Sequence, residues 1–432
     1  MPSDLGQNMT LRYKESENWL NRAEASIPLG SQTFSKSKMS LPLGAAPLFI
    51  EQGKGAIVKD IDGNSYTDYI NGLLSISLGY QDPDIDNAIK KQLSQGINFS
   101  LPHKLEAEVA EILIDLIPCA EMVRFGKNGS DATSAAIRLA RAYTGREHIA
   151  VCGYHGWQDW YIGSTTRDLG VPASTKALTH AFKYNDLESL AKVFCSQSEK
   201  VAAVILEPVN IEAPTDNFLQ KVKDLCHKNG AVLIFDEMIT GFRYSLGGAQ
   251  EYFDVMPDLA TFGKGMANGM PLSAVMGKKS IMLLMNDIFF SGTFGGETLS
   301  LAATKATLEK MKTVNYDQYI WQLGRYLFEG FEQIESDIFS LKGLPPWSFL
   351  AIENGKNSSA NEIKSWLIQE LCKREILFIG SHNLTLSHTH KDIDRLLEVY
   401  NELFAQAQYI DNKENIANHV NGHMIENVFK VR

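Results

Sequence analysis

The segment AVLIFDEMITGFR (residues 231–243) indicates the class of fold. Its first five residues are apolar without alternation, as a strand covered on both faces requires. Two carboxylates, Asp236 and Glu237, follow directly, and ligands of open α/β sheets bind at the carboxyl ends of strands. The pattern therefore predicts a site at Asp236, although taken alone it also fits a structural carboxylate that caps a turn or pairs with Arg243.

Apolar runs of strand length alternate with helix-length amphipathic segments around this stretch. The alternation predicts an α/β fold, in which helices wrap a mainly parallel central sheet. The other predicted strands are residues 122–125, 148–153, 201–208, 259–263 and 272–277.

The two ends of the chain differ from this central region. Residues 55–69 predict a β-hairpin that turns at Asp62-Gly63-Asn64, and α+β texture follows a helix near 298–312. We therefore expect a large domain over residues 76–320. A smaller α+β domain would combine the N-terminal segment 1–75 with residues 321–412, and a tail of unassigned role would occupy residues 413–432.

Composition narrows the functional classes. The chain has 432 residues, 44% of them hydrophobic, and a net charge of −10, which argues against nucleic acid or an anionic membrane as its main partner. The five cysteines are odd in number and lack C-x-x-C spacing, so neither a disulfide framework nor a metal site is expected. No apolar run is long enough for a membrane span, and no signal segment is evident. A cytoplasmic protein is the expectation.

A lysine between two glycines follows another short strand, in DLATFGKGMANGMPLSAVMG (258–277). Gly263 and Gly265 leave room for a planar molecule beside the amine of Lys264. Burial there would lower the pKa of the amine and make it a nucleophile for Schiff-base formation. A lone lysine is more often a solvated surface charge. The interpretation of Lys264 as a nucleophile therefore depends on the flanking glycines and the preceding strand.

Together, the strand ending in Asp236, the Gly-Phe-Arg step at 241–243 and the Gly-Lys at 263–264 resemble the signature of class III aminotransferases of fold type I. The resemblance runs from about residue 20 to about residue 400, and it is closest to the glutamate-1-semialdehyde 2,1-aminomutase-like branch. It implies a pyridoxal 5′-phosphate (PLP) enzyme. Lys264 would hold PLP as a Schiff base and then act as catalytic base and acid, and Asp236 would pair with the pyridine nitrogen.

A phosphate-binding turn is expected in VRFGKNGSDATSAAIRLARAYTGR (123–146), where a strand passes through glycines into a helix. The N-terminus of a helix offers free N–H groups and a favourable dipole to a phosphate. By the resemblance, Gly129 and Ser130 bind the PLP phosphate. The alternative is an ordinary helix cap.

Further cofactor-binding residues rest on the resemblance. Tyr154 would stack on the pyridine ring, unless it is simply part of an aromatic core with its neighbours. His155 is either a residue supporting the cofactor or substrate or a satisfied core histidine. Glu207, in a Glu-Pro strand end, would lie near the cofactor, with Asn210 a weaker candidate. Thr293, in FFSGTFGGETLSLAA (289–303), would bind the phosphate of a neighbouring subunit, which implies a homodimer with shared active sites.

The choice of reaction turns on IPLGSQTFSKSK (27–38). Lys36 stands where the aminomutase branch has an arginine that holds the substrate carboxylate, and lysine cannot reproduce a bidentate guanidinium clamp. The variant resembles enzymes that aminate sugars for surface glycans. We therefore expect transfer of an amino group, with glutamate as donor, to an aldehyde or ketone acceptor of that class.

Two alternatives remain open: a glutamate-1-semialdehyde 2,1-aminomutase, and a non-catalytic PLP-binding or assembly protein. A nicotinamide-dependent dehydrogenase is rejected, because no G-x-G-x-x-G opens a helix after the first parallel strand.

Overall fold

The computed structural model describes residues 12–426. Its chain forms two compact units. Of the described residues, the first takes 12–73, 78–82 and 320–426, and the second takes 74–77 and 83–319. Residues 1–11 of the predicted N-terminal segment and residues 427–432 of the predicted tail lie outside the described residues.

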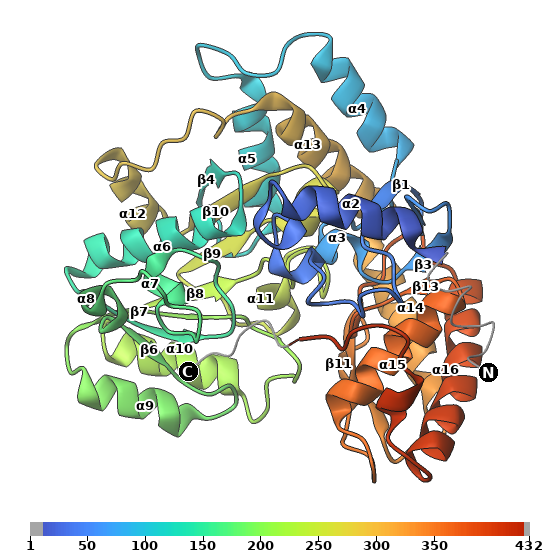
Figure 1. Cartoon of the computed structure of the whole chain (residues 1–432). Coiled ribbons are helices and arrows are strands. Elements are labelled where there is room, and N and C mark those ends of the chain that lie inside the picture. Colours follow the sequence, from blue (N-terminus) through green and yellow to red (C-terminus); the bar gives the residue numbers. More distant parts are fainter. Residues whose placement is uncertain (1–11, 427–432) are drawn as a thin grey trace. The chain divides into compact units, whose positions relative to one another are not determined.

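A seven-stranded sheet, in the order β4-β10-β9-β8-β7-β5-β6, forms the centre of the second unit (Figure 1). Its strands are β4 Met122–Gly126, β5 His148–Cys152, β6 Thr179–Ala181, β7 Val201–Leu206, β8 Val232–Asp236, β9 Leu259–Phe262 and β10 Ser273–Gly277. The pairs from β9 to β6 are parallel, whereas β10 is antiparallel to both β4 and β9. The sheet is therefore mainly parallel, as predicted. The reversed direction of β10 and the short strand β6 were not evident in the pattern of apolar residues.

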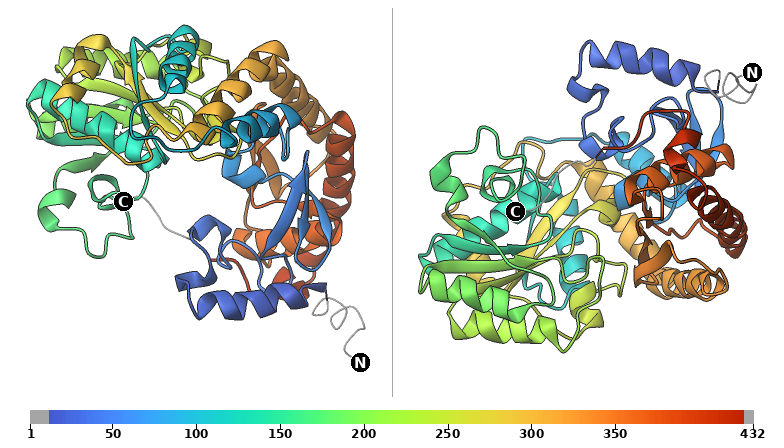
Figure 2. Two further views of the ribbon diagram at one scale, coloured as in Figure 1. Left: turned by 90° about the horizontal axis from the view of Figure 1, so that it is seen from above. Right: turned by 60° about the horizontal axis from the view of Figure 1, so that its bottom comes forward.

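Helices cover both faces of this sheet, as the two views of Figure 2 let the reader follow. Ile234 of β8 packs in a core with alanines of α6, whereas Leu233 and Phe235 pack on the other face with residues of α9 and α10. This alternation explains why the strand is apolar at every position. The helices that begin within this unit are α4 Pro83–Leu93, α5 Lys104–Leu116, α6 Gly129–Thr144, α7 Asp159–Ile162, α8 Ala173–Lys176, α9 Leu187–Ser196, α10 Phe218–Lys228, α11 Ala249–Tyr252, η3 Lys264–Ala267, α12 Lys279–Met282, η4 Leu283–Asn286, α13 Thr298–Thr313 and α14 Tyr316–Phe331.

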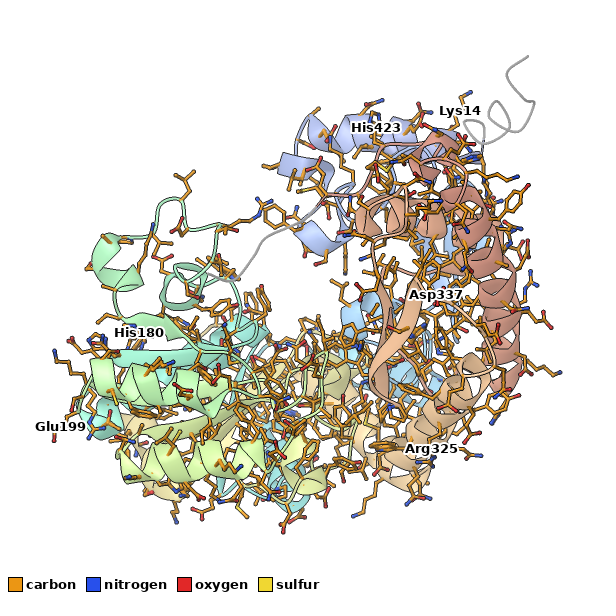
Figure 3. The ribbon with its side chains drawn as sticks, turned by 90° about the horizontal axis from the view of Figure 1, so that it is seen from below. Lys14, His180, Glu199, Arg325, Asp337 and His423 are labelled. Carbon is orange, nitrogen blue, oxygen red and sulfur yellow. The ribbon has the colours of Figure 1, made fainter. Side chains whose placement is uncertain are left out.

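The far edge of the sheet carries no site residue. Figure 3 labels His180 on the edge strand β6 and Glu199 just before β7. His180 stacks on His148 with ring centroids 5.1 Å apart. Tyr154, Glu207, Asp236 and Lys264 instead lie at or just after the carboxyl ends of β5, β7, β8 and β9.

The first unit joins the N-terminal and C-terminal parts of the chain. The hairpin of β2 and β3 turns at Asp62-Gly63-Asn64, and β3 pairs in parallel with β13, far along the chain. A common core contains Tyr66 from β3 and Ile368 from α15. The strands are β1 Ile50–Lys54, β2 Ile57–Asp60, β3 Ser65–Asp68, β11 Phe339–Leu344, β12 Trp347–Ile352, β13 Ile376–Leu377 and β14 Ser381–His382. The helices, including one at its boundary, are α2 Lys14–Glu24, η1 Pro28–Gly30, η2 Phe34–Lys36, α3 Asn71–Leu74, α15 Ala360–Lys373, α16 His390–Asp411 and η5 Ile416–His419.

The residues after α16 pack on the first unit. The backbone N–H of Ile416 donates to the Ser358 hydroxyl at 2.9 Å, and the Asn361 amide donates to the carbonyl oxygen of Ile425 at 2.9 Å. Residues 413–426 are thus held against α15, a contact that their polar sequence did not reveal. Within residues 12–426, no helix is long and apolar enough to cross a membrane.

Candidate active site

Asp236 is the last residue of β8 and is 3% exposed. Its Oδ1 accepts hydrogen bonds from the backbone N–H of Met238 at 3.1 Å and from the Thr261 hydroxyl at 3.2 Å. Its Oδ2 lies 2.8 Å from Nδ1 of His155. A buried carboxylate requires such partners, and here they leave Asp236 fixed at the carboxyl end of the sheet.

The neighbouring carboxylate, Glu237, has a different environment. It accepts hydrogen bonds from the backbone N–H groups of Ala249 at 2.8 Å and Gln250 at 2.9 Å, at the start of α11. Burial raises the pKa of Glu237 and these hydrogen bonds oppose the rise. Of the two adjacent acids, Glu237 has a structural role at the start of α11, and Asp236 is the one in contact with His155.

His155 is 1% exposed and links two strand ends. Its Nε2 lies 3.1 Å from the carbonyl oxygen of Cys152, the last residue of β5, and its Nδ1 faces Asp236 of β8. The imidazole also lies parallel to Trp160 at a centroid distance of 6.5 Å. Such burial leaves His155 in contact with Asp236 and favours a positioning role over direct contact with substrate.

Lys264 lies two residues after the end of β9 and has a left-handed backbone, with φ of 45°. Such a conformation is strained for a residue with a side chain and is typical of functional sites. Burial lowers the pKa of its amine, opposed by the negative charges of Glu207 and Asp236, while the charge of Arg243 lowers it further. Because β7, β8 and β9 are adjacent and parallel, their ends place Glu207, Asp236 and Lys264 at the same edge of the sheet.

Glu207 follows β7 and is 9% exposed. Its Oε2 accepts hydrogen bonds from the backbone N–H of Tyr154 at 3.0 Å and from the Asn210 amide at 2.7 Å. Burial and the nearby charge of Asp236 raise the pKa of Glu207. The two residues predicted from the Glu-Pro strand end, Glu207 and Asn210, therefore contact each other and the loop that carries Tyr154.

Tyr154 is 48% exposed as a residue, so it is not simply a core aromatic. It contacts Tyr161 edge-on, with ring centroids 5.6 Å apart. Its neighbour Trp160 is buried and donates to the Ser134 hydroxyl at 2.9 Å. The accessible ring follows β5, whose end adjoins that of β7.

The turn into α6 holds Gly129 and Ser130 at the first two positions of a 16-residue helix. Asn128 caps the helix by accepting from the N–H of Asp131 at 3.1 Å. The Ser130 hydroxyl accepts from the N–H of Trp157 at 3.1 Å, so the turn is tied to the loop after β5. N–H groups in the first turn have no partner within the helix, and they offer an anion-binding end.

Thr293 lies in an exposed segment between η4 and α13. The side chains of Phe289 and Phe294 beside it are 83% and 58% exposed. Within the described residues, the structure therefore shows no contact between Thr293 and the other predicted site residues.

Lys36 is exposed and lies in the first unit, at the end of η2. Its charge lowers the pKa of Asp68, although burial of that carboxyl raises the pKa overall. Lys36 thus has a defined electrostatic neighbour within its own unit, whereas the other predicted site residues belong to the second unit.

Thr261 and Arg243 are residues of this site that the sequence argument did not assign to it. Thr261 pairs with Asp236 in the register of β8 and β9, which explains the hydrogen bond between them. The sequence feature that could have identified Thr261 as a site residue is its position three residues before Lys264. Arg243 had been considered only as a partner for Asp236 or Glu237, but its charge also acts on Lys264.

The side chains and backbone groups of this site are chemically complementary to the separate parts of PLP. Lys264 offers an amine of lowered pKa for the cofactor's aldehyde carbon. Asp236 offers a buried carboxylate for the pyridine nitrogen, and the start of α6 offers N–H groups for the phosphate. Tyr154 offers an accessible aromatic face. Each part of the cofactor therefore has a complementary group in the second unit.

Comparisons with known proteins identify a family model and relatives that match most of the chain. The model of the family "Aminotransferase class-III" matches residues 41–399. A glutamate-1-semialdehyde 2,1-aminomutase of Alkaliphilus oremlandii is 36% identical over 424 residues, covering 90% of this chain and 98% of that protein. A 3-aminobutyryl-CoA aminotransferase of Cloacimonas acidaminovorans is 32% identical over 411 residues, covering 92% and 98%.

Among solved structures, the FumI protein of Sphingopyxis sp. MTA144 in its PLP internal aldimine form matches with a TM-score of 0.84 and 27% identity. The match covers 94% of this chain and 100% of that one. An omega-transaminase from Sphaerobacter thermophilus shares the fold with a TM-score of 0.81.

Proposed function

The chain belongs to the class III aminotransferase family, and from this premise we propose that Lys264 and Asp236 are its catalytic pair in a PLP-dependent amino transfer. The donor would be an amino acid such as glutamate, and the acceptor an aldehyde or ketone. The observation that carries the proposal is the placement of Lys264, Asp236 and Glu207 at the carboxyl ends of β9, β8 and β7, which are neighbours in the sheet.

Bound PLP supplies the carbonyl group that takes up the donor's amine and the ring that accepts electrons from its α-carbon. Lys264 then acts as the base and acid, because its lowered pKa lets the amine both accept and release a proton. Asp236, held by His155 and Thr261, stabilises a proton on the pyridine nitrogen. Gly129 and Ser130 bind the phosphate.

A sugar acceptor of a surface-glycan pathway is our proposal for the substrate class. A pocket of about 320 Å³ opens beside Glu207. Its lining includes two carboxylates, Glu207 and Glu212, and the amide of Asn210, but no lysine or arginine. Carboxylates and amides accept hydrogen bonds from hydroxyl groups, and the two carboxylates repel another carboxylate. The pocket therefore suits a hydroxyl-rich acceptor without a carboxylate of its own.

The second candidate is an aminomutase that returns the amino group to the same molecule, favoured by the name of the relative that is 36% identical. Lys36 argues against it, because a lysine cannot make the bidentate contact of an arginine. We assign Lys36 to contact with the acceptor.

A homodimer would complete the site through Thr293. The exposed Phe289 and Phe294 beside it support burial by a second copy, because large exposed apolar side chains that cluster mark interaction surfaces. Free cysteines at all five positions support a reducing compartment, the cytoplasm.

Two half-reactions test the proposed function. The PLP-loaded protein is mixed with glutamate, and loss of the visible cofactor band is followed; keto-sugars are then added without free glutamate, and return of the band is measured. Return of the band with formation of an amino sugar is the expected result. Turnover of glutamate-1-semialdehyde alone, with no external donor, would show that the aminomutase candidate is correct.

A further inference from the structure

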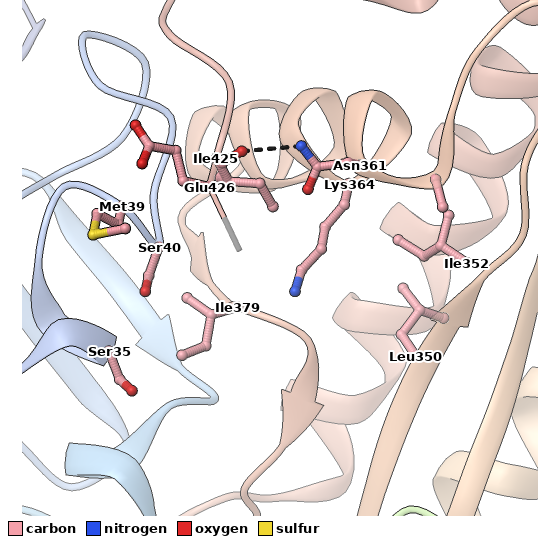
Figure 4. A pocket seen from close by; sticks show the side chains of 11 residues that line it. Ser35, Met39, Ser40, Leu350, Ile352, Asn361, Lys364, Ile379, Ile425 and Glu426 are labelled. Carbon is pink, nitrogen blue, oxygen red and sulfur yellow. Dashed lines mark hydrogen bonds between the residues drawn. The ribbon is translucent and has the colours of Figure 1, made fainter. Parts of the chain in front are cut away.

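A cavity of about 500 Å³ lies within the first unit, beside the first turns of α15 (Figure 4). Apolar and polar side chains both line it. Leu350 and Ile352 of β12 contribute to one side, and Ile379 and Ile425 contribute elsewhere. A volume of this size is in the range that holds small organic ligands.

The amine of Lys364 points into this cavity (Figure 4). Burial alone lowers the pKa of Lys364, and no negative charge opposes the effect. Within residues 12–426, no carboxylate forms an ion pair with this amine. Glu426 also lines the cavity, but it forms no ion pair with Lys364 either. A buried charged amine without an ion-pair partner is costly, and this cavity is only partly polar.

The position of Lys364 in its helix adds to that cost. It is the fifth residue of α15, close to the N-terminal end, where the helix dipole favours negative charge and disfavours a cation. Gly380 leaves space for the side chain, because a Cβ there would lie 3.2 Å from the Lys364 Nζ. A bound anion would relieve both the missing ion pair and the unfavourable dipole.

The other polar groups of the cavity restrict the charge of the ligand. Ser35 and Ser40 add hydroxyl groups, whereas the Asn361 amide is already bonded to the carbonyl oxygen of Ile425. Glu426 adds one negative charge. One ammonium group beside one carboxylate suits a single negative charge better than the double charge of a phosphate.

We propose that this cavity binds a small organic monoanion, namely a carboxylate attached to an apolar body, with the carboxylate on Lys364 and the apolar body against Leu350 and Ile352. The site draws on both ends of the chain, because Ser35 and Ser40 precede β1 and Ile425 follows α16. Binding therefore ties the segment that carries Lys36 to the C-terminal part of the first unit. This site is additional to the proposed amino transfer and does not depend on it.

Calorimetric titration of the full-length, PLP-loaded protein with sodium hexanoate tests the proposal. We expect saturation at one site per chain below about 50 mM, with acetate at least about tenfold weaker because it lacks the apolar body. Lys364→Met should weaken hexanoate binding at least about tenfold, the loss of one charge-assisted hydrogen bond. Lys364→Gln serves as a second variant if Lys364→Met fails to fold.

The matched control is Lys373→Met, which removes a lysine of the same helix whose Nζ is paired with Glu370 at 2.5 Å. It should leave the affinity for hexanoate unchanged. The titration is repeated with Lys264→Ala, so that carboxylate binding near the proposed catalytic lysine is recognised. Equal affinity in the wild type and both Lys364 variants, tighter binding of inorganic phosphate than of hexanoate, or no saturation would overturn the proposal.

Discussion

His155 Nδ1 lies 2.8 Å from Oδ2 of Asp236. On its other side, Nε2 of the same ring lies 3.1 Å from the carbonyl oxygen of Cys152, which can only accept a hydrogen bond. Nε2 therefore carries a hydrogen. Two bare acceptors would repel each other at 2.8 Å, so a proton also lies between His155 and Asp236. The pair acts as one unit that carries a proton directly behind the proposed pyridine site.

Substitution of His155 by alanine should lower kcat about 10- to 100-fold while PLP remains bound, because a hydrogen bond to a charged group is worth about 1.5–3 kcal/mol. The acidic limb of the pH–rate profile should also move. Thr261→Val removes only the 3.2 Å bond to the other oxygen of Asp236 and is the matched control; it should leave the profile in place. An unchanged profile in His155→Ala would mean that His155 is merely structural.

The lowered pKa of Lys264 predicts how cofactor loading depends on pH. Only the neutral amine is nucleophilic, so the rate at which the PLP-free protein takes up PLP should rise with pH through the pKa of Lys264. Because burial depresses that pKa, the midpoint should fall below the ordinary value of 10.5. Stopped-flow absorbance at a series of pH values measures it.

Glu207→Gln sharpens this test. The negative charge of Glu207 raises the pKa of Lys264, so its removal should lower the midpoint further. A midpoint at or above 10.5, or an upward shift in Glu207→Gln, would contradict the electrostatic description of the site.

Gly156 permits the contact between the loop after β5 and the start of α6. Its φ is +106°, and a Cβ there would lie 2.2 Å from the Ser130 hydroxyl. Gly156→Ala should therefore destabilise the fold by about 1–3 kcal/mol in urea unfolding and weaken PLP binding. Gly170→Ala is the control, because its φ is +87° but nothing lies within 4 Å of the added carbon. It should leave PLP affinity unchanged; equal losses of affinity in both variants would rule out a specific role for the Ser130 turn.

Much of the fold followed from the sequence, and for a physical reason. The strand ending in Asp236 is buried on both faces, so its uninterrupted apolar run identified a central parallel strand. The comparisons confirm the fold type, the enzyme class and the use of PLP. The three-residue strand β6 escaped notice because it has no apolar run, and the reversed β10 did so because apolar runs do not encode direction.

The site was only partly accessible from sequence. Lys264 and Asp236 stand out locally, but the role of His155 was left open, since its contact with Asp236 spans 81 residues. Lys364 gave no signal, because a lysine in an amphipathic helix normally faces solvent and only packing shows the cavity around it. Acceptor identity, dimerisation and the role of Thr293 stay predictions.

The residue to which PLP is attached can be identified chemically. PLP-loaded protein is reduced with borohydride and digested, and the peptide that carries the phosphopyridoxyl mass is identified by mass spectrometry. The account predicts one modified residue, Lys264, and loss of the modification together with activity in Lys264→Ala. Modification of another lysine, such as Lys364, with Lys264 unmodified and Lys264→Ala fully active, would contradict it.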